Sequence, residues 1–228
     1  TINATDGFVE TSGREFNINK DTTIKTKTWL IDPTNLTVED ATAYNTALNN
    51  GTDTIIQTNN TSGSDEGNIY INDEITWDKD AKLTLDAQND IFINKEITAS
   101  NGKLELLYGQ KAVAAGNTSD YHVNAKVNLK AGENFITKLG SDGATTNWTV
   151  VDASNMNSAM NADKTKSYVL GEDITLNGTK NWNPIGTNGA SFSGIFDGLG
   201  HTISNLHIND SSKDYMGLFG STSTTSLI

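Results

Sequence analysis

The sequence predicts an all-β protein built as a parallel β-helix, a solenoid in which about 22 residues make one coil. Three observations lead to this fold class. Of the 228 residues, 28 are Asn and 31 are Thr, and both types favour turns and strands over helix interiors. Apolar and polar residues alternate at the two-residue spacing of a strand. An internal repeat is the third observation, and it sets the length of the coil.

The repeat is clearest between residues 69–76 and 91–98, which share six of eight residues at an offset of 22. Further matches fit this period: 83–85 with 104–106 at offset 21, and, at offset 44, 83–87 with 127–131 and 91–92 with 135–136. A β-sandwich is the alternative architecture, but sandwich strands do not repeat at one strict period. At this period the chain makes about ten coils stacked along one axis.

Residues one period apart are expected to lie above one another in successive coils. The expected pairs are Ile71 with Ile93, Ile75 with Ile97, Asn72 with Asn94 and Asp73 with Lys95. The isoleucine pairs would fill the core, because inward positions recur every second residue. The asparagine pair predicts a ladder of amide hydrogen bonds, and the last pair sets opposite charges in register.

Two segments interrupt the strand pattern and predict short helices on the surface of the solenoid. In 37–51 one helical face carries Val38, Ala41, Tyr44 and Leu48, and Gly51 suits the position after the last turn. In 149–160 the corresponding residues are Met156, Ala159 and Met160. Loops are the alternative for both segments. A tryptophan precedes each segment, Trp29 and Trp148, and we expect both rings to pack in the core.

Charge and composition argue against several classes of partner. The net charge is −12 and only one of the 16 basic residues is Arg, so we expect no nucleic-acid partner and no binding to anionic membranes. No apolar run approaches the roughly 18 residues of a membrane span, so we expect no membrane insertion. The chain has no Cys, which excludes a disulfide or a thiolate site. Because both ends lie within strand-like patterns, we expect a fragment of a longer protein.

The sequence predicts no catalytic, cofactor or metal site and no enzyme. Four acidic residues lie close together over one turn, where a solvated face is expected: Asp73, Glu74, Asp78 and Asp80. His201 and His207 both follow Asp197 in the chain, and three histidines are few for a zinc site. We therefore expect surface histidines. Trp77 is the tryptophan expected to be the most exposed and so the candidate for carbohydrate stacking.

Both ends of the chain resemble a known family of exported proteins. Residues 1–13 and the segment 29–33 (Trp-Leu-Ile-Asp-Pro) resemble filamentous-haemagglutinin-type two-partner-secretion exoproteins, in particular high-molecular-weight adhesins of Gram-negative bacteria. Residues 181–220, which close on Gly-Leu-Phe-Gly at 217–220, resemble the GLUG-type repeat of the same class. The resemblance implies a right-handed β-helix, exported through an outer-membrane partner that acts on a region outside this chain.

The expected organisation is one β-helix over residues 1–228, with two sub-modules. Residues 1–146 would form filamentous-haemagglutinin-like coils and residues 147–228 GLUG-type coils. The expected location is the medium or the cell surface of a Gram-negative bacterium.

The chain contains nine Asn-x-Ser/Thr triplets, against a chance expectation of about six. Related adhesins are glycosylated at such triplets, so the resemblance makes them candidate modification sites. The candidates are Asn59, Asn60, Asn117, Asn147, Asn177 and Asn209.

The function expected from the sequence is that of an adhesin segment that attaches to host-cell glycans or extracellular proteins. A passive β-helical spacer of a contact-dependent toxin, a haemolysin or a haem-acquisition exoprotein is the alternative. The acidic charge favours neutral glycans or basic protein patches over sulfated polysaccharides. Contacts are expected at the loops that depart from the repeat, residues 59–67, 107–120 and 211–214.

Overall fold

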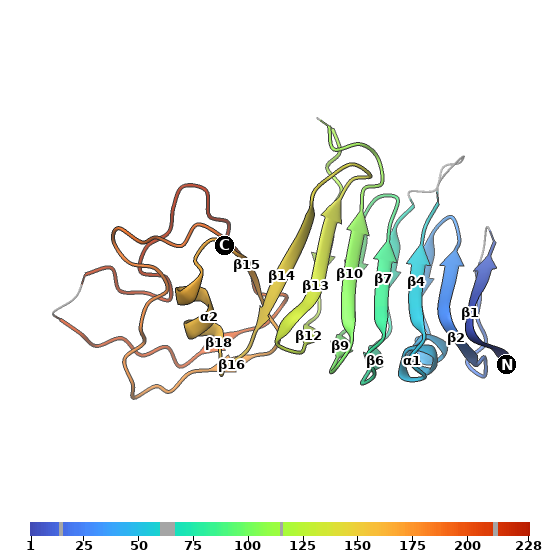
Figure 1. The fold of residues 1–228 in the computed structure, drawn as a ribbon, viewed down its shortest axis with the longest axis horizontal. Coiled ribbons are helices and arrows are strands. Elements are labelled where there is room, and N and C mark those ends of the chain that lie inside the picture. Colours follow the sequence, from blue (N-terminus) through green and yellow to red (C-terminus); the bar gives the residue numbers. More distant parts are fainter. Residues whose placement is uncertain (14–15, 60–66, 115, 212–213) are drawn as a thin grey trace.

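Strands dominate the computed structural model, which describes residues 1–13, 16–59, 67–114, 116–211 and 214–228. The predicted all-β class is confirmed, because the described residues contain many strands and two short helices. The strands follow one another along an elongated body, with the N-terminus near one end (Figure 1).

The main sheet has nine strands, and their order in the sheet follows their order in the chain (Figure 1). They are β1 (Ile2–Ser12), β2 (Ile24–Asp32), β4 (Asp53–Gln57), β7 (Lys82–Asp86), β10 (Lys103–Tyr108), β13 (Gly132–Leu139), β14 (Thr145–Val151), β15 (Ser167–Leu170) and β17 (Ile195–Asp197). Neighbours from β1 to β13 pair in parallel. The connection between two successive strands must therefore leave the sheet and return to the end at which the strands begin.

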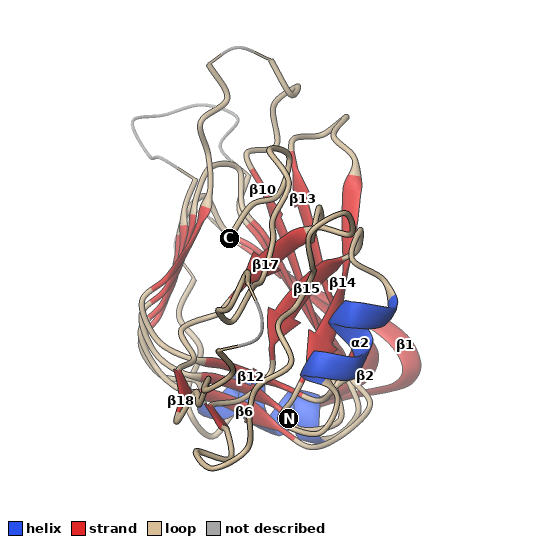
Figure 2. Cartoon of the chain, turned by 90° about the vertical axis from the view of Figure 1, so that its left-hand side faces the viewer, coloured by secondary structure: helices blue, strands red, loops and turns tan. Residues whose placement is uncertain are grey.

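Those connections carry two further parallel sheets, which lie on other flanks of the body (Figure 2). One contains β3 (Leu36–Val38), β5 (Ile69–Ile71), β8 (Ile91–Ile93) and β11 (Tyr121–Val123). The other contains β6 (Ile75–Trp77), β9 (Ile97–Ala99) and β12 (Val127–Leu129). A two-stranded parallel pair near the C-terminus contains β16 (Ile174–Thr175) and β18 (Ile203–Ser204).

The stacking predicted from the 22-residue repeat is confirmed where the repeat is clearest. Ile71 pairs with Ile93 across β5 and β8, and both side chains are buried. The predicted Asn ladder is present and has one more rung. Asn94 Nδ2 donates to Asn72 Oδ1 at 2.9 Å, and Asn124 Nδ2 donates to Asn94 Oδ1 at 2.8 Å.

The charge pair predicted between Asp73 and Lys95 is not formed in the described structure. Asp73 Oδ2 instead accepts a hydrogen bond from the backbone N–H of Ala41 at 2.9 Å. The carboxylate thereby fixes the chain just ahead of a helix, and Lys95 is exposed.

A single period of 22 residues does not hold along the whole chain. Thr149 pairs with Tyr168, 19 residues later, whereas Leu36 pairs with Ile69, 33 residues later. The matches at offset 44 are wrong, because Val127 pairs with Ile97 and Phe135 with Leu104. Strand positions must stack to form their hydrogen bonds, but the loops between them lie outside the stack and vary in length at low cost.

The main sheet is mixed, which differs from the all-parallel arrangement that the repeat predicts. β14 runs antiparallel to β13, and β15 and β17 then follow β14 in parallel. The strand direction is therefore reversed for the last three strands of the sheet.

The hydrophobic core divides into two clusters at the same place. Val150 and Val169 belong to the cluster that runs through the first part of the chain. Their neighbours Val151, Tyr168 and Leu170 belong to a second cluster. Because successive residues of a strand point to opposite faces, β14 and β15 are covered by one cluster on each face.

Both predicted helices are present and are shorter than the sequence pattern indicated. α1 (Thr42–Asn49) buries Tyr44 and Leu48 and is followed by Gly51 with a φ of +80°. Val38, expected on its buried face, belongs to β3 instead. α2 (Met156–Ala162) buries Met156 and Met160.

Three of the four tryptophans are buried in the core, including the one expected to be exposed, and Trp182 is half-buried against the second cluster. Trp29 and Trp148 are buried as predicted. The prediction for Trp77 is wrong, because its side chain is 1% exposed and its Nε1 donates to the carbonyl of Ala81 at 2.9 Å. Gly102 explains how the ring fits: a Cβ on this glycine would lie 1.8 Å from Trp77 Nε1.

Candidate functional site

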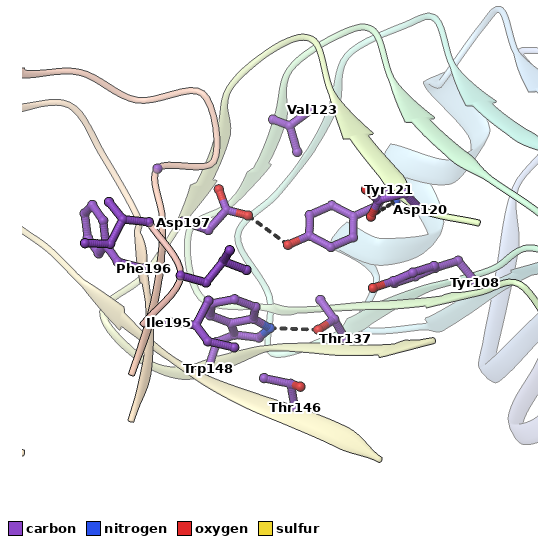
Figure 3. A pocket seen from close by; sticks show the side chains of 13 residues that line it. Tyr108, Asp120, Tyr121, Val123, Thr137, Thr146, Trp148, Ile195, Phe196 and Asp197 are labelled. Atoms are coloured by element: carbon purple, nitrogen blue, oxygen red, sulfur yellow. Dashed lines mark hydrogen bonds between the residues drawn. The ribbon is translucent and has the colours of Figure 1, made fainter. Parts of the chain in front are cut away.

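A cavity of about 580 Å³ lies where the first core cluster ends (Figure 3). Its size falls within the range of small-molecule pockets, about 300–1,000 Å³. Strands β11 and β12 are the last strands of their sheets at this end, and the main sheet reverses direction beside them. The lining comes from β10, β11, β13 and β14 on one side and from residues 195–198 and 227–228 on the other.

A hydrogen bond between Tyr121 and Asp197 spans the cavity (Figure 3). The Tyr121 hydroxyl donates to Asp197 Oδ2 at 2.8 Å, although the residues are 76 positions apart. Asp197 Oδ1 accepts from the backbone N–H of Leu199 at 2.9 Å. Burial and, after it, the carboxylate of Asp197 raise the pKa of Tyr121, so the phenol stays protonated and acts as a donor.

Tyr108 and Asp120 form a second aromatic and acidic pair at the cavity. The rings of Tyr108 and Tyr121 meet edge to face with their centroids 5.5 Å apart. Burial, and to a lesser extent Asp120, raises the pKa of Tyr108 to about 12. Asp120 is exposed, and its Oδ1 accepts the backbone N–H of Tyr121 at 2.8 Å. One carboxylate therefore lies at the rim of the cavity and the other, Asp197, is half-buried.

Trp148 supplies an apolar wall of the cavity. Its Nε1 donates to Thr137 Oγ1 at 2.9 Å (Figure 3). The centroid of its ring lies 6.0 Å from that of Phe135. The polar atom of the indole is thus used inside the protein, which leaves an aromatic surface beside the cavity. Among the described side chains that line the cavity, Asp120 and Asp197 are the charged ones. The arrangement can accept hydrogen bonds, attract positive charge and pack against a flat or aliphatic group.

One of the three loops expected to make contacts borders this cavity. The loop 107–120 supplies Tyr108 and Asp120 to the lining. Most of the loop 59–67 and half of the loop 211–214 lie outside the described residues. The contact between residues 195–198 and the loop 107–120 could not be predicted from sequence patterns, because no period relates the two segments.

The candidate glycosylation residues differ in their surroundings. Asn59, Asn147, Asn177 and Asn209 are exposed, whereas Asn60 lies outside the described residues. Asn117 is half-buried, and its Nδ2, the atom that would carry a glycan, donates to the carbonyl of Gly109 at 2.9 Å. Asn177 has its Oδ1 engaged with the hydroxyl and backbone N–H of Thr179. All six remain candidates, and this geometry favours Asn177 over Asn117.

The prediction of surface histidines is wrong for His201. Its side chain has no exposed surface, its Nε2 lies 2.9 Å from the carbonyl oxygen of Val127, and its Nδ1 lies 3.4 Å from Asp173 Oδ1. The turn before His201 lies next to β12, because the backbone N–H of Val127 donates to the carbonyl oxygen of Leu199. His207 is half-buried. No group of three or more His, Asp or Glu side chains in the described part of the chain is arranged to hold a metal ion.

The acidic turn is solvated, as expected. Glu74, Asp78 and Asp80 are exposed, and Asp73 is half-buried because of its contact with Ala41.

An aromatic ladder on the outer face of β5, β8 and β11 escaped the sequence analysis. Tyr70 and Phe92 stack with centroids 4.9 Å apart and planes within 7°. Phe92 and His122 stack at 4.6 Å and 16°. Tyr70 and Phe92 each lie between two buried isoleucines of a short strand, so they occupy the same outward position in successive repeats. This recurring aromatic position was the signal that could have revealed the ladder. Because the ring faces contact one another, the ladder offers mainly ring edges to a ligand and is a weaker candidate site than the cavity.

Comparisons of the chain with protein-family models, curated proteins and solved structures found no match. Within the described ranges, neither helix has the length and apolar character needed to cross a membrane. Fold and site together define an all-β protein with an acidic, aromatic cavity at the end of its first core cluster.

Proposed function

We propose that this chain is a segment of a secreted or surface-exposed bacterial adhesin that attaches to host-cell glycans or extracellular proteins. The single observation that carries the proposal is the cavity between β11, β13 and β14, with Tyr108, Tyr121 and Trp148 in its lining. A passive spacer needs only stacked coils, whereas a cavity of this size with converging polar and aromatic groups suits a ligand.

The proposed architecture is a right-handed parallel β-helix of the filamentous-haemagglutinin type. Parallel pairing in register across three sheets supports it, as does the Asn ladder along one edge of a sheet. The right hand is the one that parallel strand connections adopt almost without exception. The antiparallel pair β13–β14 is the departure from this pattern. Sub-modules 1–146 and 147–228 are part of the proposal, and the reversal falls next to their boundary.

The proposal also includes export from a Gram-negative bacterium. An outer-membrane partner would act on a region outside this chain, as the resemblance to two-partner-secretion exoproteins implies. The attachment would gain strength from many copies or many coils acting together, rather than from one tight contact.

The test is attachment of the purified fragment to host cells, with variants that fill the cavity. Thr146 lines the cavity, whereas Thr145 points to the opposite face of β14. We expect Thr146→Phe to lower attachment at least about tenfold by occupying the space a ligand needs. Thr145→Phe is the matched control and should attach like the parent fragment.

If Thr146→Phe attaches as well as the control Thr145→Phe, the cavity is not the attachment site. A fragment that fails to attach to any cell type or to any sugar on a glycan array would favour the passive spacer. Thermal unfolding of both variants would establish that each one is folded.

A further inference from the structure

We propose that the cavity binds a basic side chain, lysine or arginine, from an extended segment of a protein partner. The inference rests on the proposed function and narrows its ligand from glycans or proteins to a cationic protein segment. It follows from the charge, the aromatic walls and the strand edge that meet at this place.

Charge complementarity is the first argument. The charged side chains that line the cavity among the described residues are Asp120 at the rim and Asp197 further in. Asp197 already accepts hydrogen bonds from Tyr121 and Leu199, but a carboxylate has about four acceptor positions. Two of them remain for an ammonium or guanidinium group, and a charge-assisted hydrogen bond is the stronger kind.

The aromatic walls favour the same occupant. The rings of Tyr108, Tyr121 and Trp148 line the cavity, and the hydroxyl of Tyr121 and the Nε1 of Trp148 are engaged within the protein. Aromatic rings attract cations through their faces, and more strongly where water is excluded. The aliphatic stem of a lysine or arginine can pack on the same surfaces while its charged end reaches a carboxylate. A neutral sugar would gain from the rings but not from the paired charges.

The edge of β11 explains why the side chain would belong to an extended segment. β11 is the last strand of its sheet, and no further strand pairs with it within the described ranges. A strand edge of this kind offers backbone groups to an incoming strand, a common mode of peptide recognition; the N–H of Tyr121 is the exception here, because Asp120 Oδ1 already accepts it. Tyr121 lies on this strand, so a segment docked there would place a side chain next to the cavity.

Two fluorescent peptides that differ only at one central residue test the inference. One carries a central lysine, and the other carries norleucine, which keeps the aliphatic stem but lacks the ammonium group. Binding to the whole 228-residue chain is measured by anisotropy. We expect the lysine peptide to bind at least about tenfold more tightly.

Asp197→Asn should reduce this preference to less than about threefold, since the amide keeps the shape and loses the charge. Glu133→Gln is the matched control, because Glu133 is exposed and does not line the cavity. It removes the same charge from the protein and should keep the full preference. Matching thermal unfolding curves would show that the variants fold alike.

Equal binding of the two peptides, or a preference that persists in Asp197→Asn, would overturn the inference. A neutral oligosaccharide that binds while neither peptide does would also overturn it and return the site to glycans. Cell attachment is measured beside the peptides. If Thr146→Phe abolishes attachment but lysine has no advantage, the proposed function stands and the inference fails. If the lysine peptide is preferred but Thr146→Phe attaches to cells like the parent fragment, the proposed function fails and the inference stands.

Discussion

The Tyr121 hydroxyl donates a hydrogen bond of 2.8 Å to Asp197 Oδ2 and so joins β11 to β17. The two strands belong to different sheets. The bond closes a contact between the first part of the chain and its C-terminal part, at the place where the core changes from one cluster to the other.

Removing this hydrogen bond should destabilise the fold measurably. Tyr121→Phe leaves the half-buried carboxylate of Asp197 without one of its donors, which costs about 1–3 kcal/mol of unfolding free energy. Tyr108→Phe removes a hydroxyl from the same cavity that does not bond to Asp197, and should cost less than about 0.5 kcal/mol. Urea unfolding of both variants measures the difference. Equal losses would mean that the bond contributes nothing specific.

Asp86 should make the stability of the protein fall as the pH rises. Burial is the main cause that raises the pKa of Asp86 to about 6; the hydrogen bond from Gln110 and the charge of Lys138 oppose the rise, and the charges of Glu105 and Asp32 add to it. Its Oδ1 atom is buried without a hydrogen-bond partner. Because the folded pKa exceeds the ordinary value of 3.8, the folded state binds the proton more tightly. The contribution of protonated Asp86 to the free energy of unfolding is therefore present below about pH 4 and is lost as the pH rises through about 6.

Asp86→Asn should accordingly stabilise the protein at pH 7. The gain should be about 1–2 kcal/mol once solvent screening of this partly exposed group is allowed for, and it should vanish near pH 4. Asp80→Asn, on the exposed turn, serves as a control with a small and constant effect. Chemical unfolding at a series of pH values measures both. A gain that does not change with pH would contradict the assignment.

Gly102 should tolerate no side chain. Its Cβ would lie 1.8 Å from Trp77 Nε1 and 2.6 Å from the carbonyl oxygen of Ala81, so Gly102→Ala forces the buried ring to move. We expect a loss of about 3 kcal/mol or more. Gly178→Ala meets nothing closer than 3.8 Å and should change the stability by less than about 0.5 kcal/mol. Thermal unfolding with fluorescence detection follows both variants.

The contribution of each ladder Asn to the free energy of unfolding should follow the number of ladder hydrogen bonds that it makes. Asn94 takes part in two ladder hydrogen bonds, whereas Asn124 takes part in one. Each net bond is worth about 0.5–1.5 kcal/mol. Asn94→Ala should therefore cost about twice as much as Asn124→Ala in equilibrium unfolding. A larger cost at Asn124 would show that the ladder is not the source of the stability.

The strand positions could be predicted from the sequence wherever one face of a strand is buried. Ile71 and Ile93 were assigned to the core because alternation and the repeat agree there, and both are local signals. Thr84 shows the limit of that reasoning. It alternates like an outward residue, yet it is 5% exposed and its hydroxyl bonds to Glu105 on the next strand. A long side chain on the neighbouring strand, here Glu105, covers this outward position, and alternation within one strand does not indicate such cover.

The cavity could not be predicted, because it depends on a contact that no period encodes. Val150 and Val151 are consecutive apolar residues, which indicates burial on both faces. That signal does not give the direction of the partner strand, so the reversal at β14 was missed. Without the reversal, nothing brings Asp197 to Tyr121.

The reversal at β14 has a consequence for the two faces of the main sheet. At β14 the strands turn round while the sheet keeps growing the same way. The connection from β14 to β15 contains α2, whose buried Met156 and Met160 belong to the second cluster rather than the first. The main sheet therefore changes from the wall of a single core to a partition between two cores, and the cavity lies beside this change.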